Sequence, residues 1–217
     1  AAAPAAGPIT PVELTQAVRA LISERTVVLV EAPSHALMIA SVLRTDRPGG
    51  FYQNHGAGLG WAINAAIGVK LARPEADVIS LVGDGCFQFG VPGSAYWVGG
   101  ACGAAQLTVI YNNGGWRSPR ASTALVHPDG PAESNDTYWV SAGQGTRFEQ
   151  IAQATGAATG FVVTERAELA PTLARALETV RAGRSAVVNV HLSPVTAQVL
   201  SRQVPTVLTT QGASDGQ

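Results

Sequence analysis

Short apolar runs rich in β-branched residues alternate along the chain with longer segments whose apolar residues recur at helical spacing. The short runs predict strands at residues 26–30, 51–54, 78–82, 107–111, 157–164 and 185–191. The segments between them predict helices at about 11–23, 36–43, 62–71, 148–155 and 169–183. Strands that alternate with helices in this way indicate a three-layer α/β/α domain with a mostly parallel sheet.

The ends of this pattern place one domain at residues 9–193. Thr10 is the expected N-cap of the first helix, because Pro11 and Glu13 follow it at the spacing of a capping box. Residues 1–8, rich in alanine and proline, are typical of an interdomain linker, with an expression scar as the alternative. Residues 194–217 predict a tail of partial order. We therefore expect a piece of a longer polypeptide or a processed subunit.

The least regular stretch is at residues 117–146. Its prolines and clustered Asp, Asn and Ser predict a loop-rich region, and long loops in compact domains are usually functional or disordered. The side chains expected to reach a substrate from here are Trp116, Arg117, Arg120 and His127. For His127 the alternative is an ordinary turn at residues 127–130.

Composition excludes several classes of function. Charged residues make up 13% of the 217 residues and the net charge is −1, so no basic run is present to bind nucleic acid. Residues 85–116 lack charge over the length of a membrane span. Pro92, several glycines and amide side chains instead favour a strand, a short helix and a strand buried on both faces, and we exclude a membrane span. Cys86 and Cys102 form no disulfide or zinc pattern, so a cytoplasmic enzyme is the default expectation.

Two predicted strands end in polar side chains and glycines. The run at 78–82 leads into Gly83-Asp84-Gly85, and the run at 107–111 leads into Asn112-Asn113-Gly114-Gly115. In an open parallel sheet the carboxyl ends of the strands form the edge where ligands bind. A carboxylate, an amide oxygen and a backbone carbonyl are hard oxygen ligands that suit Mg²⁺, and the glycines let the backbone approach an anion.

Gly83-Asp84-Gly85 followed by Asn112-Asn113 resembles the signature of thiamine-diphosphate-dependent enzymes, in which it binds the cofactor's diphosphate through a divalent metal ion. The resemblance implies that the side chains of Asp84 and Asn113 and the carbonyl of Gly115 bind Mg²⁺. It also implies that Gly83, Gly85 and Cys86 belong to the cofactor site, with Cys86 as a small buried side chain. A Gly-Asp-Gly alone is a common turn; the pair of motifs, each after a strand, is more specific.

The resemblance extends to the turn at residues 31–35. In thiamine-diphosphate decarboxylases the corresponding turn supplies hydroxyl contacts to the diphosphate, which implies Ser34 and, beside it, His35 as cofactor contacts. Pro33 stands where relatives often place another hydroxyl. The alternatives are that Ser34 only caps the following helix and that His35 is solvated or lies next to the cap.

A third segment, residues 55–61, carries Gly56 and Gly58 and invites a dinucleotide-binding interpretation. Trp61 occupies the position of the third glycine of that fingerprint, where it would obstruct close packing. The resemblance offers another role, in which Leu59 supports the bent cofactor and the carbonyl of Ala57 accepts a hydrogen bond from its aminopyrimidine. His55 and His127 are the candidate catalytic side chains on this chain.

The order of elements from residue 8 to residue 192 matches the diphosphate-binding domain of the acetolactate synthase and benzoylformate decarboxylase branch. The resemblance implies a partner, a pyrimidine-binding domain or subunit that supplies an activating glutamate, in a homo- or hetero-oligomer such as a dimer of heterodimers. Glu31 could be suggested for that role, but on the family pattern it faces the wrong part of the cofactor. The implied substrate is a small 2-oxoacid or aldehyde, and the chain alone is expected to be silent.

Two other classes of function remain open at this point. One is an NAD(P)-dependent oxidoreductase on a Rossmann-like sheet, which Trp61 disfavours. The other is a non-catalytic assembly or regulatory subunit of the same fold.

Overall fold

The computed structural model describes residues 7–54, 56, 58–141 and 143–193. The expected linker, apart from its last two residues, and the expected tail lie outside these residues, as do His55 and Ala57.

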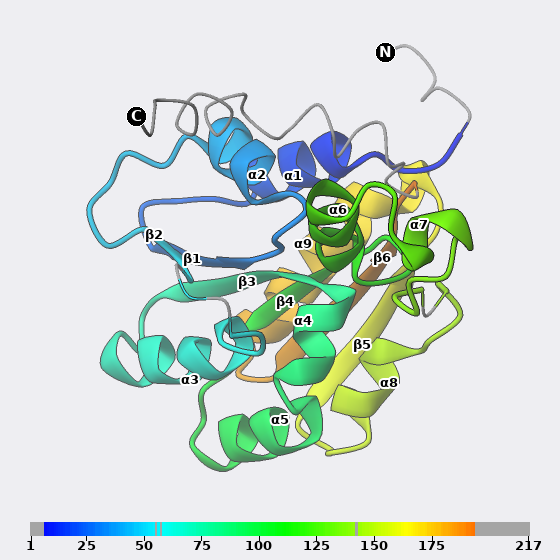
Figure 1. Ribbon diagram of the computed structural model, residues 1–217. Helices are drawn as coiled ribbons and strands as arrows, with labels where there is room; N and C mark the ends of the chain where they lie inside the picture. The colour runs from blue at the N-terminus through cyan, green and yellow to red at the C-terminus, as the bar shows by residue number, and fades with distance from the viewer. Residues whose placement is uncertain (1–6, 55, 57, 142, 194–217) are drawn as a thin grey trace, which may run out of the picture.

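The described chain forms a six-stranded parallel sheet in the order β2-β1-β3-β4-β6-β5 (Figure 1). The strands are β1 (Thr26–Glu31), β2 (Phe51–Gln53), β3 (Asp77–Gly83), β4 (Leu107–Asn112), β5 (Ala158–Val163) and β6 (Ser185–His191). Strands β1, β3 and β4 are neighbours in the sheet and run parallel, so their carboxyl ends lie side by side. This arrangement confirms the predicted α/β class with a parallel sheet.

Helices cover both faces of the sheet. They are α1 (Pro11–Arg19), α2 (Ala36–Leu43), α3 (Ala62–Ala72), α4 (Asp84–Phe89), α5 (Pro92–Ala101), α6 (Arg117–Val126), α7 (Pro131–Ser134), α8 (Phe148–Gln153) and α9 (Arg166–Arg181). One face carries α1, α2 and α9, and the other carries α3, α4, α5 and α8 (Figure 1). The three layers predicted from the alternation of elements are therefore present.

Alternate residues of the strands pack into two separate hydrophobic cores, one on each face of the sheet. In β1, Val28 and Val30 pack in the core under α1, α2 and α9, whereas Val27 and Leu29 pack in the core under α3 and α5. Because a strand points successive side chains to opposite faces, a strand buried on both faces is apolar at most positions. This is why the strands could be recognised as continuous apolar runs.

The first helix begins where the capping box predicted but ends earlier. The hydroxyl of Thr10 accepts a hydrogen bond from the N–H of Glu13 at 3.2 Å, and the carboxylate of Glu13 accepts one from the N–H of Thr10 at 2.8 Å. The predicted end near Ser23 is wrong, because α1 ends at Arg19. Beyond it the N–H groups of Leu21 and Ile22 bond only three residues back, which closes the helix as turns.

The predicted loop at 117–146 is also wrong in its first part, where α6 spans Arg117–Val126 and the short α7 follows. Pro119 falls in the first turn of α6, where a backbone N–H has no helical partner to lose. None of the residues of α6 is fully buried, so no core-facing stripe marks the helix in the sequence.

Two helices also replace the single short helix predicted between β3 and β4. Helix α4 ends at Phe89, Val91 takes a left-handed backbone conformation with φ of 49°, and Pro92 opens α5. Within the described part of the chain, no helix combines the length and the apolar character needed to cross a membrane.

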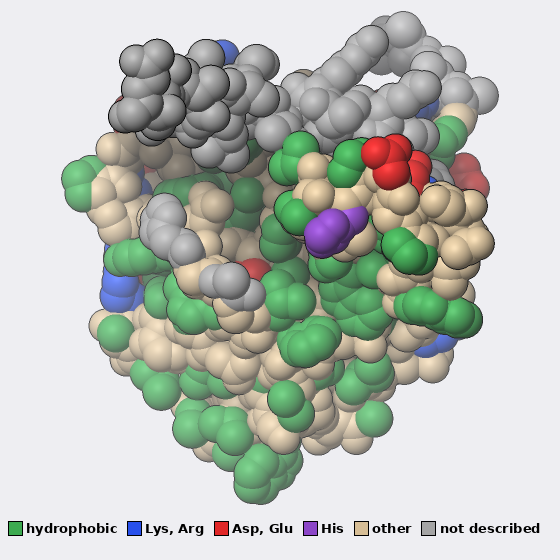
Figure 2. Space-filling model, viewed as in Figure 1, with side chains coloured by type: hydrophobic (Ala, Val, Ile, Leu, Met, Phe, Trp, Pro, Cys, Tyr) green, Lys and Arg blue, Asp and Glu red, His purple; other side chains and the backbone are tan. Residues whose placement is uncertain are grey.

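Apolar side chains gather on the surface over α3, α4 and α5 (Figure 2). Phe89, Val91 and Trp97 are 59%, 61% and 66% exposed, respectively. No charged residue lies between Gly85 and Trp116, so the surface made by α4 and α5 has no charged side chain of its own. Exposed apolar side chains that cluster in this way are typical of an interaction surface.

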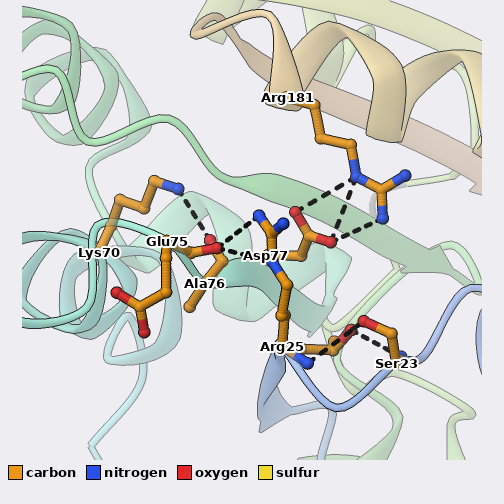
Figure 3. A network of polar contacts seen from close by, with 8 residues as sticks. Ser23, Arg25, Lys70, Glu75, Ala76, Asp77 and Arg181 are labelled. Atoms are coloured by element: carbon orange, nitrogen blue, oxygen red, sulfur yellow. Dashed lines mark hydrogen bonds and ion pairs between the residues drawn. The ribbon is translucent and has the colours of Figure 1, made fainter.

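Polar contacts stabilise the amino end of β3 (Figure 3). The buried carboxylate of Asp77 accepts hydrogen bonds from the guanidinium of Arg181 in α9, the shortest at 2.7 Å. Arg25 donates to the carbonyl of Glu75, and Lys70 donates to the carbonyl of Ala76. These contacts tie α9 and the loop before β3 to the amino end of the strand.

We predict that Asp77→Asn lowers the free energy of unfolding by about 1 to 2 kcal/mol, because it weakens charge-assisted hydrogen bonds to a half-exposed arginine. Urea denaturation would measure the loss. A double-mutant cycle with Arg181→Met provides the control, and a coupling energy of zero between the two positions would contradict the prediction.

Candidate functional site

The carboxyl ends of β1, β3 and β4 surround a cavity of about 580 Å³. Every described residue that was expected to contact the cofactor lines this cavity: Ser34, His35, Leu59, Gly83, Asp84, Gly85, Cys86, Asn113 and Gly115. The two polar strand ends meet because β3 pairs with β4 in parallel, with Gly83 opposite Tyr111. The sheet edge thus brings together segments that are distant in sequence.

Asp84 connects the two strand ends directly. Its carboxylate is almost fully buried; Oδ1 accepts a hydrogen bond from the N–H of Gly85 at 2.8 Å, and Oδ2 accepts one from the N–H of Gly114 at 3.0 Å. Burial raises the pKa of Asp84, against the opposing effect of these N–H groups and of the positive charge of Arg117. A cation bound to the carboxylate would offset the desolvation that raises this pKa.

Asn113 and Gly115 present further oxygen atoms at the same edge. Asn113 is buried and lines the cavity, and its Oδ1 accepts a hydrogen bond from the N–H of Gly115 at 3.3 Å. Gly115 has φ of +148°, and a Cβ there would lie 2.1 Å from the carbonyl oxygen of Val140. Only glycine therefore fits at the position whose carbonyl was expected to bind the metal.

The donor set suits a hard cation such as Mg²⁺. Among the described residues, no group of three or more His, Cys, Asp and Glu side chains is placed to hold a metal ion. An ion in this cavity would instead have one carboxylate, one amide oxygen and one backbone carbonyl from the chain. Mg²⁺ commonly accepts such a small protein set and completes its shell with phosphate oxygens and water.

Three nitrogen atoms around the cavity are buried without a hydrogen-bond partner in the described part of the chain. They are Nε2 of His35, Nε1 of Trp116 and Nε of Arg117, and all three residues line the cavity. Buried polar groups of native proteins are nearly always paired, so unpaired ones on residues that line one cavity are candidates for contacts with a ligand. Indole and guanidinium nitrogens donate hydrogen bonds, and these therefore fit an anion.

His35 is buried, unlike the solvated histidine considered from the sequence. Its ring centroid lies 5.7 Å from that of Tyr111, and burial lowers the pKa of His35 to about 4. The imidazole is therefore neutral at pH 7. A neutral His35 can offer an anion a hydrogen bond but no full charge.

Ser34 does not cap α2. His35 occupies the N-cap position, and the helix has no side-chain cap. The hydroxyl of Ser34 lies 3.1 Å from that of Ser118, the second residue of α6. This contact joins the turn after β1 to the first turn of α6, across the cavity wall that both residues line.

Backbone N–H groups of the glycine turn before α3 already donate hydrogen bonds to a carboxylate of the chain. Glu31 is 5% exposed and accepts hydrogen bonds from the N–H of Gly60 at 2.6 Å and from the N–H of Ala62 at 2.7 Å. The start of α3 is therefore not open to the pyrophosphate of a dinucleotide, which needs free N–H groups there. The geometry thus disfavours the Rossmann-like interpretation for a second reason besides Trp61.

Sequence analysis did not identify Glu31 or the buried amide pair Asn112 and Asn189 as residues that support the site. Asn112 accepts a hydrogen bond from the N–H of Gly114 at 3.2 Å and donates to Oδ1 of Asn189 at 3.0 Å. Asn189 donates in turn to the buried carboxylate of Glu149 at 3.0 Å. The available signal was a polar residue inside an apolar strand, as Asn189 is in β6.

Some of the residues expected to reach a substrate do not contribute to the cavity wall. His127 is exposed and does not line the cavity. Arg120 is paired elsewhere, because it forms an ion pair with Asp136 at 2.7 Å and its guanidinium lies 4.7 Å from the centroid of the Tyr138 ring. Trp116 and Arg117 do line the cavity.

Cys86 is the small buried side chain expected beside the signature. Burial raises the pKa of its thiol to about 12, and the nearby carboxylate of Glu31 adds to the effect. The thiol is neutral at physiological pH and does not act as a nucleophile.

Comparison with known proteins gives one family match over most of this domain. Residues 31–190 match the family described as thiamine pyrophosphate enzyme, C-terminal TPP binding domain. The chain is 31% identical over 193 residues to a probable acetolactate synthase of Mycobacterium bovis, which covers 88% of this chain and 32% of that protein. It is 26% identical over 126 residues to benzoylformate decarboxylase of Pseudomonas aeruginosa, covering 58% of this chain and 24% of that protein.

A solved structure shares the fold. The thiamine diphosphate-dependent 4-hydroxybenzoylformate decarboxylase of Rhodococcus jostii RHA1 superposes with a TM-score of 0.74 at 22% identity, over 90% of this chain and 34% of that one. The chain spans about a third or less of the length of each of these proteins.

We predict that Glu31→Gln lowers the free energy of unfolding by about 1 to 3 kcal/mol, because one of the two buried N–H groups loses its acceptor. Amide hydrogen exchange at Gly60 and Ala62 should quicken. Glu24→Gln, at an exposed glutamate before β1, is the matched control. Equal stability of the Glu31→Gln variant and the wild type in urea would contradict the prediction.

We predict a pH dependence of stability that comes from His35. The folded chain holds its pKa at about 4, below the ordinary 6.5, so the unfolded chain binds more protons between these values. Stability is therefore lost as pH falls through this window, by about 2 kcal/mol between pH 7 and pH 5. The wild type should lose that much more than His35→Asn over this range in urea denaturation. His127→Asn, at an exposed histidine, should keep the wild-type slope, and parallel slopes for His35→Asn would refute the assignment.

Proposed function

The chain belongs to the thiamine pyrophosphate enzymes as their C-terminal TPP-binding domain, and we propose that its cavity holds the diphosphate of thiamine diphosphate through one Mg²⁺. The side chains of Asp84 and Asn113 and the carbonyl of Gly115 would bind the ion. The observation that carries this proposal is that Asp84 and Asn113, buried at the ends of two neighbouring strands, line one cavity.

The anion itself would meet polar groups from two further segments. Ser34 and His35 present a hydroxyl and a neutral imidazole from the turn after β1, and Gly83, Gly85 and Cys86 form the wall at the start of α4. A Cβ on Gly85 would lie 1.8 Å from Nε1 of Trp116, so glycine is required for this packing. Leu59, on the far side of the cavity, is proposed to support the aminopyrimidine together with the carbonyl of Ala57.

Bound thiamine diphosphate supplies a thiazolium that acts as an electron sink for bonds next to a carbonyl group. The chain's own residues hold the diphosphate, orient the cofactor through Leu59 and present apolar walls that exclude water. The relatives named acetolactate synthase and benzoylformate decarboxylase suggest a small 2-oxoacid or an aldehyde as substrate. We propose decarboxylation or carboligation as the reaction.

Activity is proposed to need a pyrimidine-binding partner, as a second domain or subunit in a dimer of heterodimers or a similar oligomer. The acidic residues of the described cavity wall are Glu31 and Asp84, and hydrogen bonds to backbone N–H groups already engage both carboxylates. Glu31 is thus engaged at the start of α3 and Asp84 is assigned to the metal ion, so neither is proposed to activate the aminopyrimidine. The uncharged, apolar surface of α4 and α5, with Phe89, Val91 and Trp97 exposed, supports a partner that docks there.

We predict that Asp84→Ala weakens Mg²⁺-dependent binding of thiamine diphosphate by more than about 100-fold, since even residues that only orient metal ligands affect affinity by about 10- to 100-fold. Isothermal titration calorimetry of the purified chain, with Mg²⁺ and with EDTA, would measure it. Asp129→Ala, at an exposed aspartate away from the cavity, should bind as the wild type does.

Three outcomes would count against the proposal or part of it. Tight binding of NAD(P) without binding of thiamine diphosphate would favour an oxidoreductase. Full activity of a partnered complex that carries Asp84→Ala would favour a non-catalytic assembly role for the chain. Substantial decarboxylation of a 2-oxoacid by the chain alone, with thiamine diphosphate and Mg²⁺, would overturn the need for a partner.

A further inference from the structure

The first turn of α6 forms part of the cavity wall. Arg117, Ser118, Pro119 and Ser122 of this helix line the cavity. The hydrogen bond between the hydroxyls of Ser118 and Ser34 holds this turn against the segment after β1. The helix is ten residues long, and its N-cap residue, Trp116, provides no side-chain cap. Its amino end therefore presents a partial positive charge toward the cavity.

We propose that Arg117 is the anion-binding residue of the cavity and that it takes an oxyanion beside the proposed magnesium site. Two oxyanions share the required chemistry, the diphosphate of the cofactor and the carboxylate of a 2-oxoacid substrate. This proposal rests on the proposed function. It assigns to Arg117 the recognition of the ligand's negative charge. Helix α6, which carries Arg117, is a stretch that the sequence pattern predicted as a loop.

The Arg117 side chain has no carboxylate partner among the described residues. Its Nε is buried and has no hydrogen-bond partner in the described part of the chain, and no ion pair joins Arg117 to a described carboxylate within 4.0 Å. Asp84 lines the same cavity, but the proposed function assigns its carboxylate to the Mg²⁺ ion, and its two oxygens also accept hydrogen bonds from backbone N–H groups. A partly buried guanidinium without an anionic partner is unfavourable unless a ligand supplies the charge.

His35, next to Ser34 on the turn after β1, carries a second unpaired nitrogen at this cavity. It is 6% exposed, lines the same cavity, and its Nε2 also lacks a partner among the described residues. Nε1 of Trp116 is a third buried nitrogen in the same condition. Three residues with an unpaired nitrogen, from α6, from the position before it and from the start of α2, thus line one cavity. Their common complement is an oxygen-rich anion.

The charge of the cavity wall also supports the proposal. Arg117 is the sole lysine or arginine among the described residues that line the cavity, whereas Glu31 and Asp84 are both acidic. An anionic ligand would meet net repulsion there without Arg117 and a metal ion. A guanidinium also binds carboxylate and phosphate through two parallel hydrogen bonds, which a lysine cannot reproduce.

The test compares Arg117→Met, which keeps the apolar stem and removes the charge, with Arg117→Lys, which keeps the charge and removes the fork. Arg120→Met is the matched control, because Arg120 lies in the same helix and pairs outside the cavity with Asp136. Calorimetry of each purified chain would use four probes in the presence of Mg²⁺: thiamine diphosphate, thiamine, benzoylformate and methyl benzoylformate. Thiamine and the methyl ester lack the oxyanion, so they report on the contacts that the rest of each molecule makes.

We expect Arg117→Met to weaken binding of at least one of the two anions by about 10- to 100-fold, with no loss for the two probes that lack the oxyanion. Arg117→Lys should recover part of the loss, and Arg120→Met should bind every probe as the wild type does. A loss confined to thiamine diphosphate identifies the diphosphate as the partner of Arg117, and a loss confined to benzoylformate identifies the substrate carboxylate.

Failure of this inference can be told apart from failure of the proposed function. If Asp84→Ala abolishes binding of thiamine diphosphate while Arg117→Met binds both anions as the wild type does, the inference is overturned and the function stands. If the wild type binds no thiamine diphosphate but binds benzoylformate in a way that depends on Arg117, the function fails and the inference stands. Equal losses for the probes with and without the oxyanion, or a wild type that binds neither anion, overturn the inference.

Discussion

The buried carboxylate of Asp84 joins the ends of the two central strands, and the shape of the cavity depends on it. One oxygen holds the first turn of α4 through Gly85, and the other holds the turn after β4 through Gly114. Because β3 and β4 are adjacent and parallel, their carboxyl ends reach the same edge of the sheet without any contribution from a long loop. A ligand in the cavity therefore meets oxygen and N–H groups whose positions the sheet determines.

Close approach of backbone segments at glycine positions completes this edge. A Cβ on Gly60 would lie 2.4 Å from the carbonyl oxygen of Phe89, and one on Gly115 would lie 2.1 Å from that of Val140. These contacts pack the turn before α3 against the end of α4, and the turn after β4 against the segment beyond α7. Glu31 adds a buried carboxylate that neutralises the amino end of α3. Asp84 and Leu59, which directly precedes Gly60, thus line one cavity with different chemistry.

Much of the fold could be predicted because burial on both faces leaves a strong signal. In β1 every residue is buried, so the strand is apolar except at its two ends, Thr26 and Glu31. Helix α6 could not be predicted, because it carries Pro119 in its first turn and buries none of its residues fully, so its sequence is typical of a surface loop. The partners of Glu31 and Asn189 could not be predicted either, since each lies on an element distant in sequence.

The residue types of the candidate site were determined by the sequence alone. An aspartate and an asparagine directly after two apolar runs, each followed by glycine, imply oxygen ligands at one sheet edge, because the carboxyl ends of neighbouring parallel strands meet there. Only the tertiary structure decided that Arg117 faces that edge while Arg120 turns away to Asp136. The physical reason is that a motif states which atoms are present, whereas burial and pairing depend on which segments pack around them.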